Sequence, residues 1–347
     1  MMFLPQFGKL PRGNERSKVE ASANFQKGSF KNISPTEMMA DNTSMPEMLW
    51  HFLNRPANCF PAAALPSVKT SLKNIQTAKP VITWFGHSSY LIQINQKNIL
   101  VDPVFSGHAS PFTFTAKSFP GSDIYGVDDM PGIDILILTH DHYDHLDYKT
   151  VTRLLPSVKL ICTSLGVASH LVYWGCDKSK IIEFDWWDGR EVLKDITLTA
   201  APARHFSGRG LVRNKTLWSS FILQTTGHKI YIGGDSGYDK HFADIGKKFG
   251  PFDIVVLECG QYNTAWPYIH MMPEETAQAA IDLKANILLP VHWGKFSLSL
   301  HPWDEPIERV TAKAAELHVP VTTPMIGEQV IVGADYPVKH WWEAKFW

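Results

Sequence analysis

Four side chains of the kinds that bind divalent metals lie within six consecutive residues, directly after an apolar stretch. The stretch Ile133–Thr139 has the composition of a buried strand, and the next residues present His140, His142, Asp144 and His145. Imidazole nitrogens and carboxylate oxygens are ligands that zinc and similar ions accept well. No cysteine takes part, which favours a hydrolytic site with open coordination positions over a closed structural zinc site. The alternative is a polar loop whose histidines merely cap a helix, and it leaves this density of ligand-type side chains unexplained.

Six residues cannot complete the coordination of two ions, so further ligands should follow other strands. A single ligand-type residue follows each of three later apolar runs; these residues are His205 after Ile196–Ala200, Asp235 after Lys229–Gly233 and His292 after Ile287–Val291. A lone histidine after a strand is more often structural. The repeated placement at strand ends favours a shared site, and the glycines before Asp235 permit a close approach of the backbone.

The elements that must position these residues begin at Val81. Apolar or alternating runs predict strands, and these are Val81–Ile94, Asn98–Val104, Ile133–Thr139, Lys159–Thr163, Ile196–Ala200, Ser220–Thr226, Lys229–Gly233, Ile254–Leu257, Ile287–Val291 and Gln329–Val332. Gly227-His228 reads as a tight hairpin turn. Helical patterns fall between the strands, at Tyr148–Leu155, Pro273–Lys284 and Pro306–Leu317. Hairpins followed by strands interleaved with helices predict an α/β protein with two packed sheets and helices outside.

The first part of the chain has weaker periodicity. Residues 1–78 are expected to form an N-terminal extension that packs on or beside the core, with one short helix within Pro35–Asn54, and residues 79–347 to form the hydrolase domain.

Composition excludes several classes of protein. The chain has 347 residues, 44% hydrophobic, and a formal net charge of −1, which excludes a disordered chain and gives no reason to expect nucleic-acid binding. No apolar run is long enough for a membrane-spanning helix, and we read no signal peptide. Four scattered cysteines without metal-site spacing predict free thiols in a reducing compartment, hence a cytoplasmic protein.

The order of these motifs resembles the metallo-β-lactamase superfamily. His-x-His-x-Asp-His is followed by an isolated His, an Asp and a final His, and the resemblance covers residues 81 to 333. It implies an αββα sandwich of two mixed β-sheets flanked by helices, with two divalent ions, zinc foremost, at one edge between the sheets. His140, His142 and His205 would hold one ion. Asp144, His145 and His292 would hold the second, with Asp235 bridging both and Asp102 orienting ligands.

A narrower resemblance is to the phospholipases D that hydrolyse N-acyl-phosphatidylethanolamine. It rests on motifs that metal binding does not demand, among them Thr83–His87, Asp185-Trp186-Trp187, Gly234–Tyr238 and His292-Trp293-Gly294. Pro5–Lys9 resembles the leader of bacterial members of this family. The segment Phe112–Ser118 departs from the family pattern, so the resemblance does not extend to lipid preference.

This resemblance implies a zinc-dependent phosphodiesterase that releases phosphatidic acid and an N-acylethanolamine from N-acyl-phosphatidylethanolamine or a related phospholipid. A hydroxide shared by the two ions would attack phosphorus. Asp144, Asp235 and His270 are the expected catalytic residues, with His270 contacting phosphate or acting as a general acid, and His87 lines the site or is a buried strand-end histidine. The alternatives are a hydrolase of the same fold acting on a lactone, a β-lactam or a cyclic or nucleic-acid phosphodiester, and a metal-stabilised binding protein.

A phospholipid substrate calls for contact with a bilayer, so peripheral membrane association is expected. Met45, Met48, Leu49, Phe52 and Leu53 fall on one helical face and are one candidate for docking, although such stripes are more often packing faces. The other candidate is the C-terminal group Trp341, Trp342, Phe346 and Trp347. Apolar residues in the extension are consistent with a homodimer.

Overall fold

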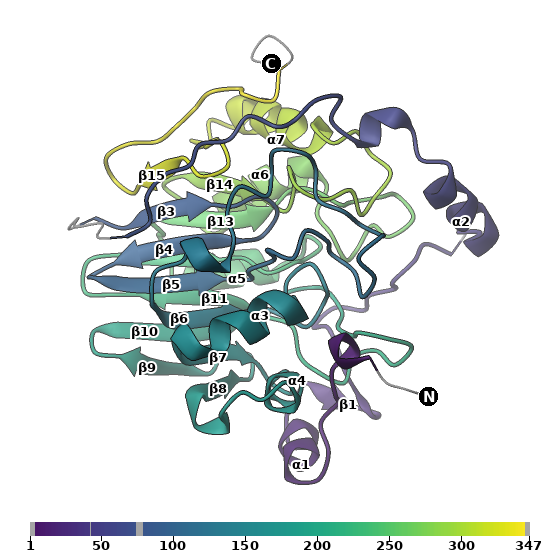
Figure 1. The fold of residues 1–347 in the computed structure, drawn as a ribbon, viewed down its shortest axis with the longest axis vertical. Coiled ribbons are helices and arrows are strands. Elements are labelled where there is room, and N and C mark those ends of the chain that lie inside the picture. Colours follow the sequence, from purple (N-terminus) through teal and green to yellow (C-terminus); the bar gives the residue numbers. More distant parts are fainter. Residues whose placement is uncertain (1–3, 42, 74–78, 344–347) are drawn as a thin grey trace.

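The computed structural model describes residues 4–41, 43–73 and 79–343, and in it two large mixed sheets pack face to face (Figure 1). The seven-stranded sheet has the order β15-β3-β4-β5-β6-β7-β8. Its strands are β3 (Val81–Trp84), β4 (Tyr90–Ile94), β5 (Lys97–Val101), β6 (Ile133–Leu138), β7 (Val158–Ser164), β8 (Ile181–Phe184) and β15 (Gln329–Ile331). The six-stranded sheet has the order β14-β13-β12-β11-β10-β9. Its strands are β9 (Gly189–Leu193), β10 (Ile196–Ala201), β11 (Ser220–Gln224), β12 (Lys229–Ile232), β13 (Ile254–Glu258) and β14 (Leu288–Val291).

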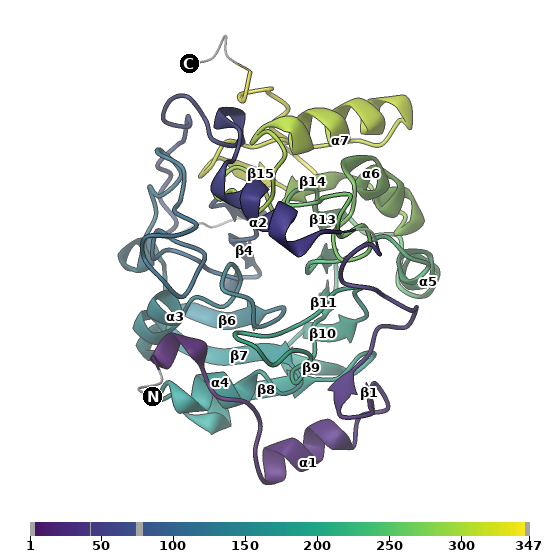
Figure 2. The ribbon, with the colours of Figure 1, turned by 90° about the vertical axis from the view of Figure 1, so that its right-hand side faces the viewer.

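Helices cover the outer faces of both sheets. Figure 2 shows α3 (Tyr148–Leu154) and α4 (Ala168–Tyr173) beside the seven-stranded sheet, and α5 (His241–Lys248), α6 (Pro273–Asp282) and α7 (Glu305–Glu316) beside the six-stranded sheet. Short 3₁₀ turns η3 (Val127–Asp129), η4 (Leu155–Ser157) and η5 (Lys178–Lys180) lie in the connections. The predicted αββα sandwich is confirmed.

Strand β6 is uniformly apolar from Ile135 to Leu138 because both of its faces are covered there. Ile135 and Ile137 face the core between the sheets, whereas Leu136 and Leu138 face the core under α3 and α4. Because successive side chains of a strand point to opposite faces, the part of the strand that is covered on both faces, Ile135–Leu138, is apolar at every position. The one polar residue of the strand, Asp134, accepts hydrogen bonds from the backbone of Asn98 at 3.0 Å and from Lys159 at 2.9 Å. These contacts with the neighbouring strands help to fix the register of β6 and thus the start of the loop that carries His140 to His145.

The N-terminal residues run along the outside of the sandwich. They form η1 (Pro5–Phe7), α1 (Asn14–Glu20), the small hairpin β1 (Phe25–Gln26) and β2 (Ser29–Phe30), α2 (Met45–Leu53) and η2 (Ala57–Cys59). Val19 and Phe30 are buried against Trp218 of the sandwich. Figure 2 shows α1 and β1 near β8 and β9, while α2 lies in front of the region between the two sheets.

Several details differ from the sequence-based expectation. The run Val81–Ile94 is two strands, because the chain reverses at 85–89 to pair β3 with β4. The helix expected within Pro35–Asn54 occupies only Met45–Leu53, where Ser44 caps its first turn. Strands β8 and β9 and helices α4 and α5 escaped prediction because their sequences are short and mixed. The hairpin turn at Gly227-His228 is confirmed by the antiparallel pairing of β11 with β12.

Trp341 and Trp342 are buried, with Trp341 stacked on Trp293 at 5.1 Å, so neither offers a membrane-docking surface. Phe346 and Trp347 lie outside the described residues. The four cysteines are buried free thiols, as expected. None of the described helices has the length and apolar character needed to cross a membrane.

Candidate metal centre

All the predicted ligands gather at one edge of the sandwich because they follow strands whose carboxyl ends meet there. His140 follows β6 and Asp102 follows β5, which runs parallel to β6. In the other sheet Asp235 and His292 follow β12 and β14, which flank β13 in parallel. Ligands commonly bind at the carboxyl ends of parallel strands. The glycines before Asp235 serve close packing, since a Cβ on Gly234 would lie 2.5 Å from the carbonyl oxygen of Ser219.

The first ligand cluster consists of His140, His142, His205 and Asp235, whose candidate ligand atoms lie within 4.8 Å of one another. Nδ1 of His142 lies 2.9 Å from Nε2 of His140 and 3.2 Å from Nε2 of His205. Oδ2 of Asp235 lies 3.8 and 3.7 Å from the same two Nε2 atoms. The three histidines predicted for one ion therefore converge on one point.

The second ligand cluster consists of His87, Asp144, His145 and His292, again within 4.8 Å. Oδ2 of Asp144 lies 3.5 Å from Nε2 of His145 and 4.0 Å from Nε2 of His292. The structure adds His87 to this group, because its Nε2 lies 2.9 Å from the same carboxylate oxygen of Asp144. Asp235 lies between the two clusters, with Oδ2 3.1 Å from Nε2 of His145 and Oδ1 3.3 Å from Nδ1 of His292.

These donors fit divalent cations. Nε2 of His142, Nε2 of His145 and Oδ1 of Asp235 are buried without a hydrogen-bond partner, and burying such polar atoms unpaired is costly. Burial lowers the pKa of His142 to about 4 and holds the pKa of His140, His205 and His292 well below the usual range. These four imidazoles are therefore neutral near pH ~7, with lone pairs available for a metal.

The two carboxylates of the clusters differ. Burial raises the pKa of Asp235 to about 6. Burial also raises the pKa of Asp144, but the charge of His145 and hydrogen bonds from His145 and His87 outweigh it and hold that pKa well below the usual range. The carboxylates of Asp235, Asp144 and Asp102 outweigh burial at His145 and raise its pKa. Excess negative charge around His145 is what a bound cation would neutralise.

Hydrogen bonds behind the ligands fix the direction of each ring. Nδ1 of His145 lies 2.8 Å from Asp102, whose carboxylate also accepts from the backbone and hydroxyl of Thr139 at 2.9 and 2.6 Å. Nδ1 of His205 donates to the carbonyl of Ile269 at 2.7 Å. Both rings therefore keep Nε2 for the site. Asp102, His87 and His292 have φ of 39°, 52° and 68°, and strained non-glycine residues of this kind cluster at functional sites.

His270 lies beside the clusters, as expected, and is paired with a residue that the sequence analysis missed. Nδ1 of His270 lies 2.7 Å from Oε2 of Glu258, while Oε1 of Glu258 accepts from the backbone of Ser236 at 2.5 Å. Burial raises the pKa of Glu258 and lowers the pKa of His270. Glu258 ends the otherwise apolar strand β13. An acidic residue at a strand end is the sequence feature from which its place in the site could have been predicted.

The N-terminal residues contribute a second missed contact. The side-chain amide of Asn32 donates to the carbonyl of His205 at 2.8 Å and accepts from its backbone N–H at 3.1 Å. Nε1 of Trp218 also donates to Asn32, at 3.1 Å. The pair of bonds fixes the backbone of a candidate ligand from a residue 173 positions away. No local pattern in the sequence predicts a contact between residues so far apart in the chain.

Arg209 stabilises the loop that carries His140 to His145. Its buried guanidinium donates to the carbonyls of Asp141 and Leu146, both at 2.7 Å, and to the carbonyl of Gln6 at 2.8 and 2.9 Å. The carboxylate of Asp141 points away from the clusters and accepts from Gly208 at 2.7 Å and Thr216 at 2.8 Å. The loop that carries His140 to His145 is therefore held at both ends.

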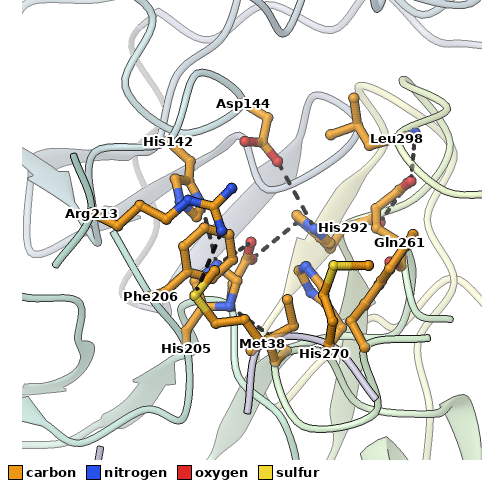
Figure 3. A pocket seen from close by; sticks show the side chains of 14 residues that line it. Met38, His142, Asp144, His205, Phe206, Arg213, Gln261, His270, His292 and Leu298 are labelled. Atoms are coloured by element: carbon orange, nitrogen blue, oxygen red, sulfur yellow. Dashed lines mark hydrogen bonds and ion pairs between the residues drawn. The ribbon is translucent and has the colours of Figure 1, made fainter. Parts of the chain in front are cut away.

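The clusters form the floor of an open pocket of about 280 Å³ (Figure 3). His142, Asp144, His205, Asp235, His270 and His292 all line it, together with Met38 and Met39 of the extension and Phe206, Arg213, Gln261, Trp266, Ile269 and Leu298. Figure 3 shows Asp144, His142, His205, His292 and His270 around one central space. The structure thus brings every predicted ligand and His270 to one place, whereas their roles stay predictions.

Comparison with known proteins identifies the family of this chain. Residues 97–293 match the family of beta-lactamase superfamily domains. An uncharacterized protein of Mycobacterium tuberculosis is 38% identical over 332 residues, covering 94% of this chain and 89% of that protein. N-acyl-phosphatidylethanolamine-hydrolyzing phospholipase D 1 of Caenorhabditis elegans is 30% identical over 249 residues, covering 67% of this chain and 70% of that protein. An isothiocyanate hydrolase from gut bacteria of Delia radicum has the same fold, with a TM-score of 0.56 at 21% identity over 73% of this chain and 100% of that one.

Proposed function

Because this chain belongs to the metallo-β-lactamase superfamily of metal-dependent hydrolases, we propose that it is a zinc-dependent phosphodiesterase of phospholipase D type. Its substrate would be N-acyl-phosphatidylethanolamine or a related phospholipid, cleaved to phosphatidic acid and an N-acylethanolamine. The observation that carries the proposal is the pair of ligand clusters joined by Asp235, with His270 facing the same pocket. The similarity to the Caenorhabditis elegans phospholipase D supports this substrate class.

Two divalent ions held by the clusters would supply an activated water and neutralise charge on the phosphoryl oxygens. The chain's own residues have two tasks. Asp235 and Asp144 orient the site, since Asp144 approaches His145 of the second cluster and Asp235 approaches histidines of both clusters. Water adds its oxygen to phosphorus while the bond from phosphorus to the ethanolamine oxygen breaks. That oxygen leaves as an alkoxide and needs a proton, and His270 is placed to give it.

The hydrogen bond to Glu258 determines which atom of His270 faces the pocket. With Nδ1 occupied, Nε2 is the atom available to the substrate. Burial in the pocket lowers the pKa of His270. The ring must therefore take up a second proton before Nε2 can donate one, and it then releases that proton readily to the more basic alkoxide. The ring stands 5.0 and 5.2 Å from the rings of His205 and His292, centroid to centroid, which sets it beside both clusters.

The size of the pocket supports a substrate that is presented from a surface. At about 280 Å³ it lies just below the range of small-molecule pockets, which span roughly 300–1,000 Å³. Such a space accepts a phosphodiester and its nearest groups. The acyl chains of a phospholipid would stay outside, in a bilayer against which the pocket mouth is placed.

Exposed apolar side chains lie on segments next to that mouth and support peripheral membrane docking. Leu49, Trp50 and Leu53 of α2 are 61%, 65% and 74% exposed, and their neighbour Phe52 stacks on the pocket residue Trp266 at 6.2 Å. Leu211 and Val212, which directly precede the pocket residue Arg213, are exposed as well, and so are Phe112 and Phe114 after Pro111 of a neighbouring pocket. Contiguous exposed apolar groups of this kind mark interaction surfaces.

The proposal is tested by product analysis. N-acyl-phosphatidylethanolamine in mixed vesicles is incubated with zinc-loaded protein, and the products are identified by mass spectrometry. Phosphatidic acid and N-acylethanolamine should appear in equal amounts and disappear when a chelator removes the metal. Asp235→Asn serves as the matched variant, because it keeps the side-chain size but removes the charge shared by the clusters, and it should lose both turnover and metal. Absence of phosphatidic acid with metal bound would refute the proposal.

A further inference from the structure

One cation at the pocket mouth has no carboxylate partner within the described part of the chain. Arg213 is exposed and forms none of the ion pairs found among residues 4–41, 43–73 and 79–343. Its guanidinium lies over the ring of Phe206 at 5.2 Å, and Nη1 donates to the thioether sulfur of Met38 at 3.6 Å. A thioether is a weak acceptor, so most donors of the guanidinium are available to a ligand. Figure 3 shows Arg213 reaching over Phe206 beside His142.

Arg213 stands where two pockets meet. It lines the pocket over the metal clusters and also a neighbouring pocket of about 400 Å³, walled by Phe7, Pro111, Tyr143 and Gly210 among others. The two pockets share only the residues His142, Asp144, Phe206 and Arg213 among those described. A phosphodiester likewise has two ester substituents joined to one negatively charged phosphoryl group. The shared residues therefore stand where the phosphorus of a bound diester would lie, with one substituent directed into each pocket.

The other arginine of this region cannot serve the substrate. Arg209 lines the neighbouring pocket, but its guanidinium is buried and donates to the carbonyls of Gln6, Asp141 and Leu146. Arg209 therefore connects the N-terminal residues to the loop that carries His140 to His145. Arg213 is the guanidinium left for an anion, and a planar guanidinium matches two phosphoryl oxygens at once.

We propose that Arg213 binds a non-bridging phosphoryl oxygen of the substrate and thereby selects anionic phosphodiesters over neutral esters. This inference rests on the proposed function and goes beyond it, because the metal clusters alone would accept either kind of ester. Arg213 acts on binding: it neutralises a charge that is present before and after bond cleavage, so its removal should raise KM more than it lowers kcat.

The experiment uses two probes that differ in charge, bis(para-nitrophenyl) phosphate and its neutral methyl triester. Wild type, Arg213→Gln, Arg213→Lys and the control Arg16→Gln are compared as zinc-loaded proteins of measured metal content. Arg16 pairs with Glu20 on the surface of α1 and lines neither pocket, so the control makes the same charge change elsewhere. The triester is followed as substrate, or as competitive inhibitor where it is not cleaved.

Arg213→Gln should raise KM for the diester by about ten- to a hundredfold, as expected for a charged hydrogen bond, with kcat within about threefold of wild type. Arg213→Lys should recover part of the loss. KM or Ki for the triester, and the metal content, should not change. An unchanged KM for the diester, or equal losses on both probes, would overturn the assignment. If metal-loaded wild type leaves the diester intact, the same variants are compared by KM for N-acyl-phosphatidylethanolamine in vesicles. A metal-loaded wild type that cleaves neither compound would refute the proposed function, and the inference with it.

Discussion

Nδ1 of His270 and Oε2 of Glu258 lie 2.7 Å apart in a partly buried hydrogen bond beside the candidate metal clusters. The bond leaves Nε2 of His270 for the pocket. We therefore expect Glu258→Ala to lower kcat by roughly ten- to a hundredfold, the range seen when partners that orient site residues are removed. His270→Ala should lose more, roughly 10²–10⁴-fold, because it removes the proton donor itself.

Steady-state kinetics with metal analysis checks this pair of variants. Glu258→Gln is the matched control, because it can still accept a hydrogen bond from Nδ1 and should retain more activity than the alanine variant. Zinc content should stay at the wild-type level in all three proteins. Full activity of Glu258→Ala would show that His270 needs no orientation by Glu258.

Asn32 should control metal affinity through the backbone of His205. Asn32→Ala removes both amide bonds to His205, and we expect the zinc affinity to fall by roughly ten- to a hundredfold. Asn24→Ala is the control, because Asn24 also belongs to the N-terminal residues and bonds to Asp185 at 2.8 Å, away from the ligands. Competition with a chromophoric chelator measures the affinity. Equal affinities in the two variants would contradict this role.

The apolar residues of α2 should bind membranes. Replacing Leu49, Trp50 and Leu53 with serine removes three exposed apolar side chains, and we expect the partition coefficient onto phospholipid vesicles to fall at least about tenfold. The control replaces Val172, Ile281 and Val338 with serine; these residues are also exposed but lie outside α2. Co-sedimentation with vesicles measures binding. If the control triple variant lost as much binding, α2 would not be the docking element.

His241 should make the fold sensitive to acid. Burial lowers its pKa to about 4, and its Nε2 lies 3.2 Å from the hydroxyl of Ser236. An unfolded histidine titrates near pH ~6.5, so between about pH 6.5 and about pH 4 the unfolded chain binds a proton that the folded chain does not. Stability must therefore fall as pH drops through this window.

His241→Gln keeps a polar group near Ser236 but does not titrate. Between about pH 7.5 and about pH 5 the free energy of unfolding of the variant should decrease less than that of wild type, by up to about 2 kcal/mol. Urea unfolding at the two pH values measures the difference. Parallel losses in both proteins would mean that His241 does not carry this acid sensitivity.

The sequence was sufficient to predict those parts of the fold and of the site that depend on residues close together in the chain. The apolar run of β6 and the residues that follow it place His140, His142, Asp144 and His145 within one loop, and a strand end precedes Asp235 and His292. Asn32 and Arg213 could not be predicted, because their roles depend on contacts with residues far away in the chain or on the shape of a pocket. The membrane-docking prediction needed the structure for the same reason: Trp341 and Trp342 are buried, whereas Leu49 and Leu53 are not.

The central claim is that the two clusters direct water to the phosphorus of a phospholipid diester. Hydrolysis of N-acyl-phosphatidylethanolamine in water labelled with heavy oxygen tests it most directly. Attack on phosphorus places the label in the phosphatidic acid, and the N-acylethanolamine stays unlabelled. Label in the N-acylethanolamine, or products other than these two, would contradict the account.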